Sequence, residues 1–199
     1  MMPTNHTFSS SPQRGFTLIE VIISIAIMSI GVLTLIAAFG AAIGSTSSAE
    51  EDLIARQKAL EAMESIYTAR NTQQLTFNQI ANIASGGIFT DGPTPLQYAG
   101  PDGLVNTADD TNFAASGVCP AGPECIVVPG PDGVLGTADD QAMSLGNFTR
   151  QIQISNVLEP DGVTINPNLK QVIVTVTYNR IGQTVPHSYT VNALISAFR

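Results

Sequence analysis

Six aspartates lie in two copies of one short motif, and their side chains are the first candidates for metal chemistry in this sequence. The motif Gly-Pro-Asp-Gly-x-x-x-Thr-Ala-Asp-Asp occupies residues 100–110 and returns thirty residues later, at 130–140. Eight of the eleven positions are identical in the two copies. Carboxylate oxygens are the hard ligands that Ca²⁺ prefers. The candidate ligands are Asp102, Asp109, Asp110, Asp132, Asp139 and Asp140.

Two interpretations of this repeated motif stay open. The order Asp-Gly, five further residues and then Asp matches the later half of a calcium-binding EF-hand loop. The earlier ligand positions hold Tyr98 and Gly100 in the first copy, and the closing residue is Asp instead of the longer Glu. We therefore expect either an irregular calcium site, within one copy or shared by both, or two solvated acidic turns set by Pro-Asp-Gly.

The remaining reactive side chains offer one covalent bond and no hydrolase site. Cys119 and Cys125 are the only cysteines, and we expect them to form a disulfide if this part of the protein lies in an oxidising compartment. His187 is the only histidine after His6 and is predicted to be an ordinary loop residue beside Pro186. Because the sequence has no Gly-x-Ser-x-Gly motif and no second histidine after His6, we expect the protein not to be an enzyme.

Charge is scarce and mostly negative along the chain of 199 residues. Charged residues make up 12%, and 16 acids against 8 bases give a net charge of −8. Proteins that bind a nucleic-acid backbone need clustered Lys and Arg, so we expect no nucleic-acid partner. Two cysteines are also too few for a disulfide scaffold and lack the spacing of a four-ligand zinc site.

A membrane-sized apolar segment follows a single acid near the N-terminus. Residues 21–43 contain no charged side chain, and the residue before them is Glu20. About 20 apolar residues in a helix are enough to cross a bilayer core. A secretory signal peptide would have a shorter apolar run after a basic region. A plain membrane anchor leaves Glu20 unexplained, because a charge near the membrane is costly without a cationic partner.

A short motif surrounds Glu20: residues 14–20 read Arg-Gly-Phe-Thr-Leu-Ile-Glu, which places the acid fifth when counted from the Phe. This motif, followed by the apolar segment, resembles the processing site of type IV pilins and type II secretion pseudopilins. In that family a prepilin peptidase cuts after the Gly and methylates the new N-terminal residue. The resemblance therefore implies cleavage between Gly15 and Phe16 and N-methylation of Phe16. It also implies that Glu20 sets the assembly register by meeting the ammonium of a neighbouring subunit.

The rest of the sequence predicts an α+β head. Residues 49–69, after a predicted interruption at 45–48, have the pattern of an amphipathic helix. Its expected core-facing stripe consists of Leu53, Leu60, Met63 and Tyr67. Residues 148–158, 172–178 and 189–197 alternate with a period of two, as half-buried antiparallel strands do. We therefore expect a long N-terminal helix packed on a small antiparallel sheet.

Composition divides the chain into five expected segments. They are a leader (1–15), a transmembrane or filament-core helix (16–44), an amphipathic helix (45–72), a loop-rich acidic region that contains both repeats (73–147), and the antiparallel sheet (148–199). The loop-rich region holds most of the Gly and Pro residues.

The resemblance implies a structural function. The chain is expected to be a minor pilin of a type IV pilus or related filament, matured by prepilin peptidase and assembled through its N-terminal helix. Its partners would be the peptidase, other pilin-like subunits, an inner-membrane assembly platform and membrane lipid. It would begin as a single-pass protein of the bacterial inner membrane with its head outside the cytoplasm, and end in a pilus or pseudopilus.

No cofactor is required by this expectation, and calcium is the one that the repeats suggest. Two alternatives remain. The chain could be a pseudopilin of a type II secretion system, or a membrane-anchored calcium-binding or adhesive module that does not assemble.

Overall fold

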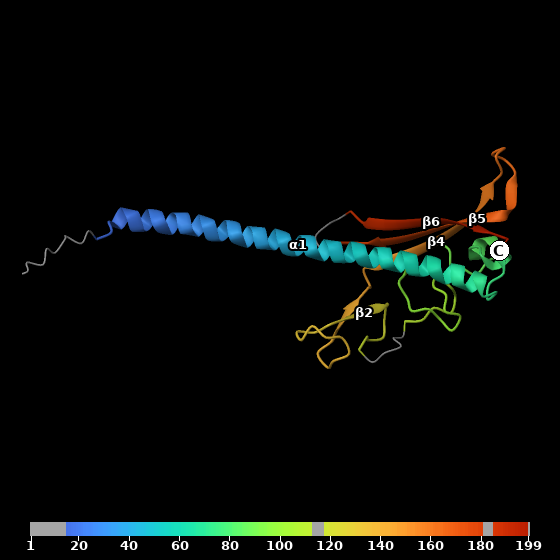
Figure 1. Cartoon of the computed structure of the whole chain (residues 1–199), viewed down its shortest axis with the longest axis horizontal. Coiled ribbons are helices and arrows are strands. Elements are labelled where there is room, and N and C mark those ends of the chain that lie inside the picture. Colours follow the sequence, from blue (N-terminus) through green and yellow to red (C-terminus); the bar gives the residue numbers. More distant parts are fainter. Residues whose placement is uncertain (1–14, 113–117, 181–184, 199) are drawn as a thin grey trace, which may run out of the picture. The chain divides into compact units, whose positions relative to one another are not determined.

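A computed structural model describes residues 15–112, 118–180 and 185–198. The chain divides into two compact units, Met1–Ser47 and Ser48–Arg199, which are described one at a time. Residues 1–14 of the predicted leader lie outside the described residues. One helix, α1 (Leu18–Asn71), begins in the first unit and ends in the second (Figure 1).

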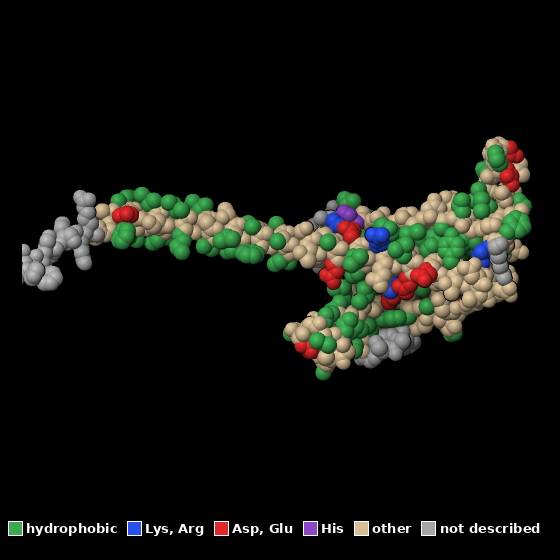
Figure 2. Space-filling model, in the orientation of Figure 1, with side chains coloured by type: hydrophobic (Ala, Val, Ile, Leu, Met, Phe, Trp, Pro, Cys, Tyr) green, Lys and Arg blue, Asp and Glu red, His purple; other side chains and the backbone are tan. Residues whose placement is uncertain are grey.

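In the first unit, α1 is apolar on all sides. Its Leu, Ile, Val, Met and Phe side chains are exposed, and Figure 2 shows them along this part of the helix. The few hydroxyls bond to the preceding turn: Ser24 Oγ donates to Glu20 O and Ser29 Oγ to Ile25 O, both at 2.7 Å. The predicted interruption at 45–48 is wrong, because α1 continues through it. Thr46 Oγ1 there donates to Ala42 O at 3.1 Å, so the helix accommodates these polar residues.

In the second unit, α1 packs on the sheet through a face rich in small residues. The buried positions are Ile54, Ala55, Lys58, Ala59, Ala62, Met63, Ile66 and Ala69. The predicted stripe is therefore partly wrong, since Leu53 and Leu60 are exposed while Met63 is buried. Alanines let the helix axis approach the sheet closely, and the two leucines are left on another face.

The main sheet has four antiparallel strands in the order β1-β4-β5-β6. They are β1 (Thr94–Pro95), β4 (Phe148–Leu158), β5 (Ile165–Tyr178) and β6 (His187–Ser196). The three predicted strands are confirmed, and β1 adds a short edge. His187 begins β6 and stacks on Tyr178 with ring centroids 5.8 Å apart, so its assignment to a loop is wrong.

The loop-rich region contains elements that the sequence pattern did not reveal. Two short 3₁₀ helices, η1 (Phe77–Gln79) and η2 (Ile83–Ser85), precede a hairpin formed by β2 (Cys125–Val128) and β3 (Gln141–Ser144). Asn82 lies between η1 and η2, and its side chain closes part of the free edge of β4. Asn82 Nδ2 donates to Ile152 O at 2.7 Å, and Asn82 Oδ1 accepts from Ile154 N at 2.8 Å.

Candidate functional site

The predicted cleavage dipeptide lies directly before α1. Residues 15–17 are not helical, and Phe16 is exposed. A Cβ added at Gly15 would meet no atom within 4 Å, so packing in the described part of the chain does not require glycine here. Thr17 starts the helix, because its carbonyl and hydroxyl oxygens accept from Glu20 N at 3.1 and 3.4 Å. The dipeptide is therefore presented next to a stable helix end.

Glu20 lies in the first turn of α1 with an exposed side chain. Its carboxylate has no hydrogen-bond or ion-pair partner among the described residues, although its backbone groups are bonded. A negative charge at this end is favourable to the helix dipole. The position is four residues, or about one turn, after Phe16. The carboxylate is thus unpaired within the part of the chain that the structure describes.

The helix after Glu20 has the length and composition of a membrane span. Among the described residues, α1 is the one helix long and apolar enough to cross a bilayer, and its most apolar stretch is not buried against the rest of the chain. A Cβ added at Gly31 or Gly40 would meet no atom within 4 Å. Small residues of this kind allow other helices to approach closely in lipid. Length and composition therefore suit both a membrane anchor and a helical bundle.

Comparison with known protein families agrees with this N-terminal geometry. Residues 10–36 match the prokaryotic N-terminal methylation motif, and the matched segment includes Gly15, Phe16 and Glu20. This chain carries the type IV pilin-like signal. The match does not separate minor pilins from pseudopilins. No curated protein and no solved structure matches the chain.

The predicted disulfide between Cys119 and Cys125 is confirmed, with Cα atoms 6.0 Å apart. The residue before Cys125 makes a buried ion pair with α1: Lys58 Nζ donates to Glu124 and, at 2.8 Å, to Glu61 Oε2. Burial lowers the pKa of Lys58, but its hydrogen bonds to Glu124 and Glu61 outweigh burial and leave that pKa raised. The pair joins the cysteine loop to the helix.

Arg150 is a second buried cation, and the sequence analysis missed it. Its side chain is 1% exposed on β4, and its Nε donates to Asn106 Oδ1 at 2.5 Å. Its two terminal nitrogens have no hydrogen-bond partner among the described residues. Burial lowers the pKa of Arg150, against the attraction of Glu124 and Asp110. The signal in the sequence was the alternation of side chains along the strand. Arg150 lies two residues from both Phe148 and Ile152, so its side chain is on the same buried face of the sheet.

The two repeats form the same hydrogen-bonded turn. In the first copy, Asp109 Oδ2 accepts from Asp102 N at 3.3 Å and Asp109 Oδ1 accepts from Thr107 Oγ1 at 2.7 Å. In the second copy, Asp139 accepts from Asp132 N at 3.2 Å and from the Thr137 hydroxyl at 2.6 Å. The Thr hydroxyl bonds lower the pKa of Asp109 and that of Asp139.

The last aspartate and the first glycine complete this turn. Asp110 accepts from Asn106 N and Asp140 accepts from Gly136 N, each at 2.7 Å. A Cβ added at Gly130 would lie 2.1 Å from Asp139 O, and one added at Gly100 would lie 2.4 Å from an Asp109 carboxylate oxygen. The close approach of the turn's two ends explains the glycine in the motif.

The carboxylates therefore act as acceptors within each turn. Among the described residues, no three His, Cys, Asp or Glu side chains are grouped so that they could hold a metal ion. The geometry gives the calcium site on Asp102, Asp109, Asp110, Asp132, Asp139 and Asp140 no support. Calcium binding stays a prediction.

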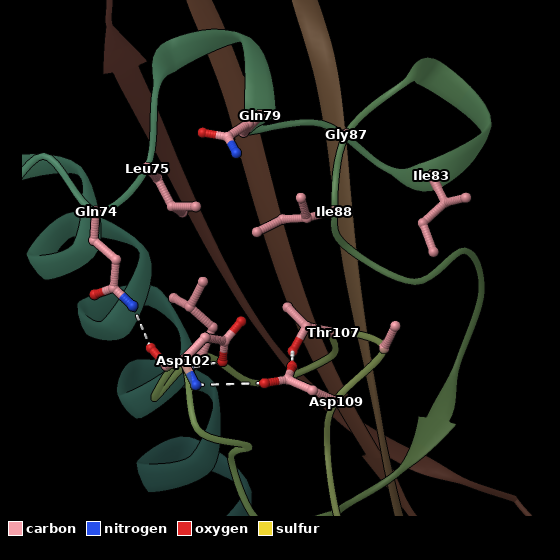
Figure 3. Close-up of a pocket in the computed structure, with 11 residues that line it drawn as sticks. Gln74, Leu75, Gln79, Ile83, Gly87, Ile88, Asp102, Thr107 and Asp109 are labelled. Carbon is pink, nitrogen blue, oxygen red and sulfur yellow. Dashed lines mark hydrogen bonds between the residues drawn. The ribbon is translucent and has the colours of Figure 1, made fainter.

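A shallow pocket lies where the first repeat meets the end of α1 and η1 (Figure 3). Its wall combines Leu75 and Ile88 with Thr107 and Asp109, and Gln74 donates a hydrogen bond to Asp102 O across it. The described lining contains no histidine, cysteine or lysine. Its carboxylate at Asp109 is already bonded to Thr107. The lining side chains thus pack against the turn of the first repeat, and the described lining brings no group of reactive side chains together.

Proposed function

We propose that this chain is a structural subunit, of the minor-pilin kind, in a type IV pilus or related filament. The methylation motif at residues 10–36 carries the proposal. The unburied apolar part of α1 supports it, because such a surface needs lipid or other helices around it. In this proposal the subunit waits in the bacterial inner membrane with its head outside the cytoplasm, has no catalytic role, and then enters the filament.

Prepilin peptidase is the proposed maturation partner. It would cut between Gly15 and Phe16 and methylate the new amino group of Phe16. The non-helical backbone at residues 15–17 supports this, since a protease needs a chain segment that is not wound into a helix. The open surroundings of Gly15 also support it, because cleavage there breaks no packing in the described residues.

Assembly would depend on the pairing of two charges from different subunits. Cleavage leaves an ammonium at Phe16, and Glu20 of a neighbouring subunit would meet it among apolar helices. Each of these charges is costly when buried alone and tolerable when paired. Pairing would therefore set the register in which subunits join. The proposed partners are other pilin-like subunits and the inner-membrane assembly platform.

Mass spectrometry of the chain from cells that contain the peptidase tests maturation. The expected N-terminus is methylated Phe16. A Gly15→Val variant is expected to fold normally, because added atoms at Gly15 meet nothing within 4 Å, and to keep its leader. A wild-type chain that keeps its first fifteen residues in such cells would refute the proposed function.

Isolated filaments test assembly and separate the alternatives. Glu20→Ala is expected to be processed but missing from filaments, whereas Glu20→Asp keeps the charge and should enter them in part. A processed wild-type chain that never enters a filament would instead indicate a membrane-anchored module. Loss of protein secretion without loss of surface pili, after deletion of the gene, would favour the pseudopilin alternative.

A further inference from the structure

The point at which α1 begins is set by hydrogen bonds to one residue, Thr17. The helix begins at Leu18, and residues 15–17 lie outside it. Thr17 O accepts from Val21 N at 3.2 Å, and Thr17 Oγ1 accepts from Glu20 N at 3.4 Å. A side-chain oxygen that accepts from the third N–H of a helix makes the bond of an N-cap residue. Thr17 is therefore the N-cap of α1.

A second threonine cap in the same chain serves as a comparison. At η1, Thr76 Oγ1 accepts from Gln79 N at 3.4 Å, and Gln79 Oε1 accepts from Thr76 N at 2.9 Å. These two bonds form a complete capping box. Residues 17–20 have the matching pattern Thr-x-x-Glu, but among the described residues only the bond to the threonine hydroxyl is present. The hydroxyl of Thr17 thus caps α1 without help from the Glu20 carboxylate.

This cap determines the conformation of the bond that the proposed peptidase would cut. An N-cap residue has an extended backbone, so it is not at the same time an interior residue of a helix. The cap at Thr17 therefore keeps the peptide bond between Gly15 and Phe16 outside α1. Packing does not do this, since Phe16 is 83% exposed and a Cβ added at Gly15 would meet no atom within 4 Å.

Loss of the cap would allow the helix to begin earlier. Alanine is a poor N-cap and the most favourable helix former, so Thr17→Ala removes the stop and also favours continuation. Gly15 can serve as an N-cap in its place, and the helix would then begin at Phe16. The two effects act in the same direction and together shift the ratio of the two helix starts by about tenfold.

We propose that Thr17 is a positioning residue for maturation: its hydroxyl holds the start of α1 at Leu18 and so presents the Gly15–Phe16 bond to the peptidase in an extended form. The inference rests on the proposed function and adds to it a residue that acts through the backbone. It gives Thr17 a role in cleavage that is separate from the role of Glu20 in assembly.

Cleavage of the purified full-length chain in detergent by a prepilin peptidase tests this role, with kcat/KM measured from the mass of the product. Two substitutions separate a cap from a side-chain shape that the peptidase recognises. Thr17→Asn keeps an oxygen that can cap the helix but changes the shape, whereas Thr17→Val keeps the shape and loses the oxygen. Thr34→Ala is the matched control, because Thr34 Oγ1 donates to Gly31 O at 2.8 Å in the interior of α1.

Thr17→Ala is expected to lower kcat/KM by between about twofold and tenfold, since a tenfold change in the ratio of helix starts limits the fall in the fraction of chains that can be cut. Thr17→Val should also be cut more slowly than wild type, and Thr17→Asn and Thr34→Ala at the wild-type rate. The Cα carbon chemical shift of Phe16 in the uncut chain should move toward its helical value in Thr17→Ala and stay unchanged in Thr17→Asn.

A slowly cut Thr17→Asn chain beside a normally cut Thr17→Val chain would overturn the inference, because the peptidase would then be recognising the shape of the side chain. Slower cutting of Thr17→Ala with an unchanged chemical shift at Phe16 would also overturn it. Both results leave the filament proposal standing. A wild-type chain that the peptidase does not cut would refute the proposed function and this inference with it.

Discussion

Leu104 and Leu135, at neighbouring positions of the two repeats, allow one substitution to be compared in two environments. Leu104→Ala removes a side chain that is 1% exposed in the core cluster, and removal of a buried leucine costs about 2–5 kcal/mol. Leu135→Ala removes one that is 60% exposed, and surface substitutions change stability by about 0.5 kcal/mol or less. Leu104 is the fifth residue of its motif and Leu135 the sixth, and each lies beside a valine, so the two variants lose the same side chain from similar turns in different environments.

Pulse proteolysis of the full chain in detergent, in a series of urea concentrations, measures this difference for the head. We take Leu104→Ala to lower the free energy of unfolding by about 3 kcal/mol, and that free energy to fall by about 2 kcal/mol per molar urea. The urea midpoint should therefore fall by about 1.5 M. Leu135→Ala should leave the midpoint within about 0.3 M of wild type. Equal shifts in the two variants would refute the claim that only the first copy supports the core.

Three further predictions concern the head. Because the pKa of Lys58 is raised above 10.5, its contribution to stability is fully present below pH 10.5 and is lost as the pH rises through the folded value; unfolding midpoints at rising alkaline pH should fall for wild type, and less for Lys58→Met. Replacing Cys119 and Cys125 together with serine should lower the free energy of unfolding by about 2 kcal/mol, measured by the same proteolysis, and an unchanged midpoint would mean that the bond constrains nothing. Calorimetry with millimolar Ca²⁺ tests the calcium prediction: heat that disappears in an Asp110→Asn, Asp140→Asn variant would support it, and absence of heat from wild type would remove it.

The elements with long, regular patterns were predictable from the sequence. The apolar helix follows from an unbroken run without charge, and β4 follows from its alternation between residues 148 and 158. The disulfide followed from there being only two cysteines and an expected oxidising location. The N-terminal motif was visible because its residues act through the chain's local sequence, without any tertiary contact.

The remaining features depend on tertiary contacts that local patterns do not contain. Each strand of the β2–β3 hairpin has four residues, too few for a period to show against the surrounding Gly and Pro. The stripe on α1 was misplaced because leucines outweigh alanines in any hydropathy pattern, whereas the sheet selects the small side chains. The repeats are nearly identical in sequence, so only the fold could show that one is buried and the other exposed.

The amide of Asn82 has a consequence for contact between molecules. Unpaired strand edges invite a second molecule to add a strand, and sheets can then grow from molecule to molecule. Asn82 occupies a donor and an acceptor site on β4 that a foreign strand would need. A single side chain thereby blocks strand addition along this part of the β4 edge.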